Sequence, residues 1–257
     1  MLKAIKSFLA VVDNQTYFVT VCSLIATYLC DIYEIRADLP SGLIGIAIIF
    51  PIVFSINAAY KRREDVLKYF ASLKAHGVAL YLAHSDWTTD ENFGKDRAKK
   101  HFLSLLSNVN SFFLCQTNEI EVWNKKIFSN FKEFSKSHEK LRESGLAATE
   151  ISRANQYLRS MMIEFEKMKN IKLYQTPKSL RAYSQIFLNL FPILYAPYFA
   201  QICYDSHIYS GYIVAFIYSV VLVTLDNIQE DLENPFDRIG EDDVDLDVIS
   251  EYNDILA

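Results

Sequence analysis

The side chains best suited to chemistry in this chain gather in an acidic run near the C-terminus, residues 241–247. Within it, Asp243, Asp245 and Asp247 have the spacing of the first half of a calcium-binding EF-hand loop. The second half of that pattern is missing, because Val248 stands where the loop requires glycine. A solvated acidic tail that packs on a neighbouring subunit is therefore the alternative to a calcium site.

The remaining reactive side chains form no catalytic or metal-binding pattern. The five histidines include no pair four residues apart, and the four cysteines lack metal-type spacing, so we interpret them as free thiols or packing residues. A disulfide between Cys30 and Cys203, near the outer ends of two apolar stretches, is the alternative. We find no Ser-His-Asp arrangement, phosphate-binding loop or paired carboxylates. The sequence therefore predicts that the protein is not an enzyme and binds no cofactor. Calcium is the alternative to the absence of a cofactor.

Four apolar stretches must set the position of any such site. No Asp, Glu, Lys or Arg occurs in residues 14–30, 39–60, 182–204 or 206–225. About 20 helical residues cross a hydrocarbon core of about 30 Å, and lipid admits only helices or closed barrels. Since no strand-like alternation persists, we predict an all-α membrane protein with four transmembrane helices in two hairpins and a cytosolic helical bundle.

The apolar stretches divide the chain into four parts. In order, these are a first transmembrane hairpin (15–60), a cytosolic helical region (61–181), a second hairpin (182–226) and an acidic cytosolic C-terminal segment (227–257). Prolines interrupt the spans, and we expect Pro51 to bend the second helix and Pro192 and Pro197 to kink or break the third.

The pattern of the cytosolic region predicts three helices, each with an apolar stripe that faces the core of a bundle. The first continues the second span from Arg62 to about Leu82, and the third runs from about Ala147 to Lys169. Between them we expect one long helix that ends near Gly145. Its stripe comprises Phe102, Leu106, Val109, Phe113, Ile120, Trp123, Ile127, Phe131 and Phe134.

Charge sets the orientation and excludes one class of partner. The basic residues that flank the spans are Lys3, Lys6, Lys61, Arg62, Arg63, Lys178 and Arg181. They fall on one side if both termini are cytosolic, in line with the positive-inside rule. We therefore expect an integral protein of the plasma membrane with lipid as a partner. The net charge of −5 argues against nucleic acid.

Two segments resemble the bestrophin family of pentameric ion channels, particularly its bacterial branch. Residues 45–62 are similar to the family's second helix, a Gly-led apolar run that ends in Asn-Ala-x-Tyr-x-Arg. Residues 231–236 resemble its Asn-Pro-Phe stretch, which an acidic run follows, and a Thr-Pro junction at Thr176-Pro177 precedes the third span. The chain departs from the pattern at Arg63, where the family usually has Trp, and at Asp237-Arg238-Ile239, where Gly is usual.

The resemblance implies a homopentamer whose central pore conducts ions passively, chloride or other anions by family preference. Ile46, Phe50 and Phe54 match residues that form a hydrophobic neck, and Tyr174 is the nearest match to a cytosolic aperture. Asp242 and Asp245 are the nearest matches to the calcium clasp of animal bestrophins.

Several alternatives stay open. The face of Ile46, Phe50 and Phe54 has the spacing of an ordinary packing face against a neighbouring span. Monovalent cations are the alternative permeant ions, because the outer loops and the tail are acidic. A rival from another class is a non-conducting membrane scaffold whose cytosolic bundle binds partners.

Overall fold

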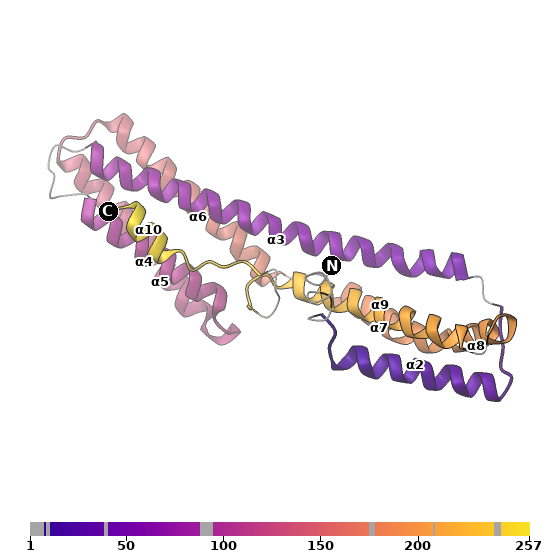
Figure 1. Ribbon diagram of the computed structural model, residues 1–257. Coiled ribbons are helices and arrows are strands. Elements are labelled where there is room, and N and C mark those ends of the chain that lie inside the picture. Colours follow the sequence, from indigo (N-terminus) through magenta and orange to yellow (C-terminus); the bar gives the residue numbers. More distant parts are fainter. Residues whose placement is uncertain are drawn as a thin grey trace. The chain divides into compact units, whose positions relative to one another are not determined.

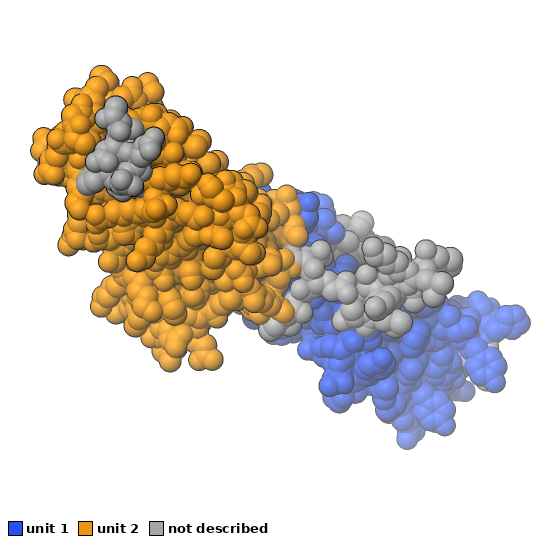
Figure 2. Space-filling view, turned by 60° about the vertical axis from the view of Figure 1, so that its left-hand side comes forward, with its two compact units in different colours: residues 1–61, 176–233 blue, residues 62–175, 234–257 orange. Residues whose placement is uncertain are grey.

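The computed structural model describes residues 8, 11–38, 41–87, 95–174, 178–207, 209–238 and 243–257; the side chains at 41–44, 46–49, 51 and 178–180 are not described. Every regular element in these ranges is a helix, which confirms the predicted all-α class (Figure 1). The chain divides into two compact units, coloured separately in Figure 2. Unit 1 comprises residues 1–61 and 176–233, and unit 2 comprises residues 62–175 and 234–257.

Unit 1 contains the apolar helices. They are α2 (Asn14–Ile32), the first part of α3 (Ser41–Asp86), α7 (Lys178–Leu194), α8 (Ala196–Asp205) and α9 (Ser210–Glu233). Helix α2 packs against α7, α8 and α9, and α9 also contacts α7 and α8. Two apolar clusters hold these helices together, one around Tyr195, Phe199 and Ala215 and one that joins α3 to α7 and α9.

Three helical segments in the described residues have the length and composition of membrane spans: Asn14–Ile32, Arg181–Asp205 and Ser210–Glu233. The remaining expected span lies in the first part of α3, where several side chains fall outside the described residues. The third span is broken as predicted, because α7 ends at Leu194 and α8 begins at Ala196 with Pro197 in its first turn. Pro192 instead lies inside α7, and its carbonyl accepts a hydrogen bond from Ser23 Oγ at 2.7 Å.

The four cysteines are free thiols, as the sequence predicted. Cys203 is buried, and the thiol of Cys115 donates to the Phe112 carbonyl at 3.1 Å. The alternative of a disulfide between Cys30 and Cys203 is therefore wrong. Both behave as small side chains in the apolar helices of unit 1.

Unit 2 is a helical bundle. Its elements are the rest of α3, α4 (Lys95–Leu114), the 3₁₀ turn η1 (Thr117–Glu119), α5 (Ile120–Glu143), α6 (Ala148–Leu173) and α10 (Ile249–Ile255). The long helix expected between the first and third cytosolic helices is wrong: the structure has α4 and α5, which break at residues 115–119 and pack side by side (Figure 1). Folding back lets both halves of the apolar stripe bury in one core, which a continuous helix would not allow.

Glycine has a specific task at two places in unit 2. Gly77 of α3 faces the ring of Phe102 on α4 so closely that an added Cβ would lie 2.0 Å from it. Gly145 has a φ of 93°, and it follows α5 in a Schellman motif with bonds from Gly145 N to Arg142 O and from Leu146 N to Leu141 O. The predicted stop at Gly145 is thus confirmed, and α6 starts shortly after it.

A buried histidine network lies in the core of unit 2. His84 and His138 are almost fully buried, with ring centroids 5.5 Å apart. His84 Nδ1 donates to the Leu80 carbonyl at 2.8 Å, so its Nε2, 2.7 Å from Ser137 Oγ, accepts from that hydroxyl. Burial lowers the pKa of His84 from 6.5 to about 4, and it also lowers the pKa of His138. Both rings are neutral at pH 7.

We expect this network to make unit 2 less stable in acid. The folded pKa of His84 lies below its unfolded value, so the unfolded chain binds more protons, and stability is lost as the pH falls from 6.5 toward 4. The loss should reach about 3 kcal/mol near pH 4, seen as a falling melting temperature of the purified protein. In His84→Gln the pH dependence of stability should be flatter than in wild type. An equal slope in the two proteins would contradict the prediction.

Candidate functional site

An exposed aromatic face on the first part of α3 is the candidate neck. Phe50 and Phe54 are 62% and 58% exposed, although both lie in an apolar helix. Their rings meet edge to face with centroids 4.8 Å apart, and Val53 beside them is also exposed. The side chain of Ile46 lies outside the described residues, but its backbone is part of the same helix.

The opposite face of α3 packs into unit 1. Ile52, Ser55 and Ala59 are buried, and Ile52 joins Leu188 of α7 and Leu222 of α9 in one cluster. The helix therefore has one face inside its own subunit and one face outside it. Phe50 and Phe54 do not belong to the core of a single copy, so they are available to water, lipid or another subunit.

The C-terminal end of α6 is the candidate aperture. Helix α6 ends at Leu173, and Tyr174 follows it with 74% of its surface exposed. The guanidinium of Arg62 holds this end, since Nη2 donates to the carbonyls of Ile171 at 2.8 Å and Tyr174 at 2.9 Å. The Thr176-Pro177 junction lies outside the described residues.

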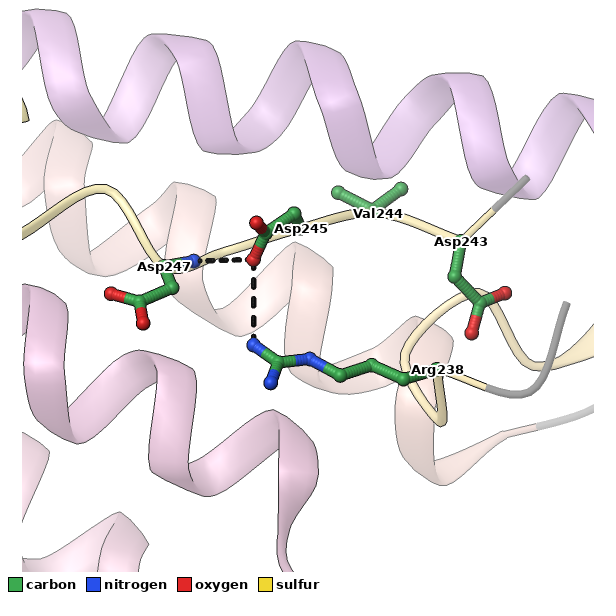
Figure 3. A pocket seen from close by; sticks show the side chains of 5 residues that line it. All are labelled: Arg238, Asp243, Val244, Asp245 and Asp247. Atoms are coloured by element: carbon green, nitrogen blue, oxygen red, sulfur yellow. Dashed lines mark hydrogen bonds and ion pairs between the residues drawn. The ribbon is translucent and has the colours of Figure 1, made fainter. Parts of the chain in front are cut away.

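The acidic segment forms a shallow hollow of about 370 Å³ that Figure 3 shows from close by. Asp245 Oδ1 accepts from the backbone N–H of Asp247 at 2.9 Å and from Arg238 at 3.4 Å. Arg238 has a φ of 62°, a left-handed conformation that favours glycine. Asp242 lies outside the described residues, and within them no three His, Cys, Asp or Glu side chains are placed to hold a metal ion. The carboxylate of Asp245 is thus partnered by a guanidinium.

The tail that carries these acids is not simply solvated. Val244 and Leu246 point into the core of unit 2 and are only 5% and 3% exposed. Phe236 of the Asn-Pro-Phe stretch is also buried, and its ring stacks on Phe113 of α4 at 4.4 Å. The alternation of aspartate with Val and Leu is the signal that the sequence reasoning missed, since alternate residues of an extended chain face opposite sides.

Leu246→Ala should therefore destabilise unit 2 by about 2 to 3 kcal/mol, the usual cost of emptying a buried leucine site. Thermal unfolding of the purified protein measures the effect. Asp247→Ala on the exposed side of the segment is the control, with an expected change below about 0.5 kcal/mol. Equal shifts for the two variants would show that the segment does not belong to the core.

A polar cluster between α7 and α9 was not anticipated from the sequence. Arg181 forms ion pairs with Glu230 and, at 3.5 Å, with Glu233, whose carboxylate is 4% exposed and accepts no hydrogen bond from the described residues. Asn189 Nδ2 donates to Asp226 at 3.2 Å. The acids recur every three or four residues along α9, a spacing that aligns them on one helix face.

No family model matches the chain, and no curated protein matches it. Solved structures, by contrast, match over nearly the whole length. A point variant of a bacterial bestrophin homolog from Klebsiella pneumoniae superposes with a TM-score of 0.77 at 17% identity, over 94% of this chain and 96% of that one. A second point variant of the same homolog matches with a TM-score of 0.77 at 17% identity, over 94% of this chain and 95% of that one.

These matches establish the class of architecture: the chain has the fold of a bestrophin-type helical membrane protein. A third structure of the Klebsiella pneumoniae homolog, obtained by Zn-SAD phasing, agrees with a TM-score of 0.76 at 17% identity and 94% coverage of each chain. The fold implied by residues 45–62 and 231–236 is therefore confirmed. At this level of identity the likeness concerns the fold, and the residue roles rest on the arguments given for each site.

Proposed function

We propose that this chain is the subunit of a passive ion channel of the bestrophin type. Five copies would surround a central pore, with α3 of each copy as the lining helix. The observation that carries the proposal is the exposure of Phe50 and Phe54 on the side of α3 opposite its buried face. An apolar face that is exposed in a single subunit is typical of a surface that water, lipid or further subunits cover in the assembled protein.

Ten phenylalanines would form a narrow apolar neck of two stacked rings, one of five Phe50 and one of five Phe54 side chains. Such a constriction holds water poorly and admits ions at the cost of part of their hydration shell. Ile46 would add a further ring on the same helix. Selectivity would then depend on neck width and on the charges at the two mouths, without a cage of carbonyl oxygens.

We propose anions, chloride among them, as the permeant ions, because this is the preference that the bestrophin resemblance implies. The basic residues Lys61, Arg62 and Arg63 near the inner end of the span would favour anions at that mouth. Monovalent cations are the alternative, favoured by the acidic outer loops with Asp31, Glu34, Asp38 and Asp205. Both termini would lie in the cytosol of a protein in the plasma membrane.

The test is recording from purified protein in planar bilayers under KCl and NaCl gradients. A current with a reversal potential near that of chloride would support an anion channel, and one near that of potassium or sodium would support the cation alternative. Mass measurement of the intact oligomer in detergent tests the homopentamer in parallel. An intact oligomer that carries no current in any gradient would contradict the channel and favour the scaffold.

Calcium binding at the acidic segment is a weaker proposal. Asp245 Oδ1 already accepts from Arg238 and from the Asp247 amide, so a calcium ion at that oxygen would compete with a guanidinium. We therefore expect channel currents to be the same in calcium and in chelator. A calcium-dependent current that Asp245→Asn abolishes would instead support a clasp.

A further inference from the structure

We infer that Arg62 is the residue that positions the cytosolic aperture, and this inference rests on the proposed channel function. The side chain links two helices of unit 2 that are distant in sequence. From α3 it reaches the last turn of α6, where Nη2 is 2.8 Å from the Ile171 carbonyl and 2.9 Å from the Tyr174 carbonyl. These two carbonyls lie on either side of the exposed Leu173.

The chemistry of a helix end explains why a guanidinium belongs here. The last carbonyls of an α-helix have no N–H partner within the helix, and this end carries partial negative charge. In α6 the Asn170 carbonyl accepts from the Tyr174 N–H at 2.9 Å, and the next carbonyl, that of Ile171, accepts from Arg62 at 2.8 Å. A cation that donates to two of these oxygens therefore fixes where the helix stops and how the chain leaves it.

A second cation in the same region reaches outward from α6, whereas Arg62 reaches toward it. Lys172 of α6 donates from Nζ to the carbonyls of Phe113 at 2.7 Å and Cys115 at 3.1 Å, which close the end of α4. The last turn of α6 is thus tied to α4 by Lys172 and to α3 by Arg62. The Leu173 and Tyr174 side chains project from this anchored turn, with exposed fractions of 41% and 74%.

The consequence for permeation is specific. If Tyr174 narrows the pore, the width of that constriction depends on a backbone that Arg62 holds. Removing the guanidinium should let the α6 terminus fray, so that larger ions pass. Arg63, the next residue, is a matched control of equal charge, because its guanidinium donates to Glu64 at 2.9 Å.

The experiment combines two measurements on the full-length oligomer. Hydrogen exchange of the amides of residues 170–174 should become about tenfold faster in Arg62→Gln and stay unchanged in Arg63→Gln. The second measurement, in bilayers, uses a series of ions of increasing size that carry the same sign of charge as the ions that wild type conducts. In this series Arg62→Gln should raise the relative permeability of the largest ions about threefold to tenfold. Arg62→Lys keeps the charge but not the forked donor geometry, so it should fall between wild type and Arg62→Gln.

A double-variant cycle separates positioning of the aperture from a general effect on structure. In a Tyr174→Ala background the aperture side chain is gone, so Arg62→Gln should add less than about a twofold change in relative permeability. If Arg62→Gln does not assemble, the same cycle is run with Arg62→Lys. Equal effects of Arg62→Gln with and without Tyr174, or equal effects of Arg62→Gln and Arg63→Gln, would overturn the inference.

The two measurements also distinguish failure of the inference from failure of the proposed function. Absence of current in wild type would overturn the channel, and the aperture with it, while exchange at residues 170–174 would still report whether Arg62 holds the helix end. Normal current with an unaltered permeability series in Arg62→Gln would leave the channel in place and overturn the positioning role.

Discussion

Replacing Phe50 and Phe54 together with alanine is expected to raise single-channel conductance about threefold to tenfold. The two rings are large and exposed on the proposed pore face of α3, and their removal from five subunits widens and wets the neck. A barrier reduction of about 1 kcal/mol is sufficient for an increase of this size. Recording of wild type and variant under the same ion gradient measures it.

The same substitution should cost little stability in the single subunit. Phe50 and Phe54 are already more than half exposed, so alanine removes little buried surface and leaves the cluster around Ile52 intact. The matched control is Phe18→Ala with Phe216→Ala, which truncates two aromatics of similar exposure, 69% and 52%, on α2 and α9. Its conductance should equal that of wild type.

Two outcomes would contradict the neck. An unchanged conductance in the Phe50 and Phe54 variant, with the oligomer intact by mass, would show that these rings do not limit the flow of ions. Loss of stability without current in either protein would support the scaffold, in which the same face packs against other helices.

The second large effect is expected at the polar cluster of unit 1. Arg181→Met should lower stability by about 3 kcal/mol, because it leaves the carboxylate of Glu233 buried beside no described cation. The apparent melting temperature of the detergent-solubilised protein should fall by several degrees. The side chain of Glu230 is half exposed, so water solvates its negative charge when Arg181 is removed.

That difference between the two glutamates supplies the control. Adding Glu233→Gln to Arg181→Met should recover most of the lost stability, because the uncompensated buried charge disappears with it. Adding Glu230→Gln should recover little. Equal recovery of stability by both second substitutions would contradict the prediction. It would show that Glu233 is hydrated in the folded protein and that burial of its charge does not cause the loss of stability.

The helical spans illustrate a feature that local sequence determines. A charge-free run of about 20 residues has few alternatives to a helix in lipid, since every backbone polar group must be satisfied within the segment. The break of the third span follows in the same way, because Pro197 has no N–H to donate and suits the first turn of a new helix. Gly145 is a third case, as its φ of 93° is a conformation that other residues rarely adopt.

The break between α4 and α5 shows the limit of such reasoning. Residues 115–119 contain neither Gly nor Pro, and the apolar stripe resumes in register at Ile120, seven residues after Phe113. What ends α4 is the burial gained when α5 returns along it, a contribution that depends on helices not adjacent in sequence. Periodicity shows which face of a helix is apolar, but it does not show where the helix turns back.

The candidate sites divide along the same line. Phe50 and Phe54 could be selected from spacing and resemblance, yet spacing alone allowed them to be core residues, and only the burial of Ile52 on the other face excluded that within one subunit. Arg62 was recognised in the sequence as a flanking charge, while its contact with the Tyr174 carbonyl joins residues 112 positions apart.

By itself, then, the sequence determined that this protein is helical, where its apolar spans lie and which helix carries an aromatic face, because these properties follow from local hydrophobicity and helical period. The tertiary structure decided what each face meets. It placed Glu233 in the interior beside Arg181, turned Val244 and Leu246 into the core, and set Arg62 on the end of α6. Such contacts depend on burial and on long-range pairing, and neither quantity is encoded in the spacing of neighbouring residues.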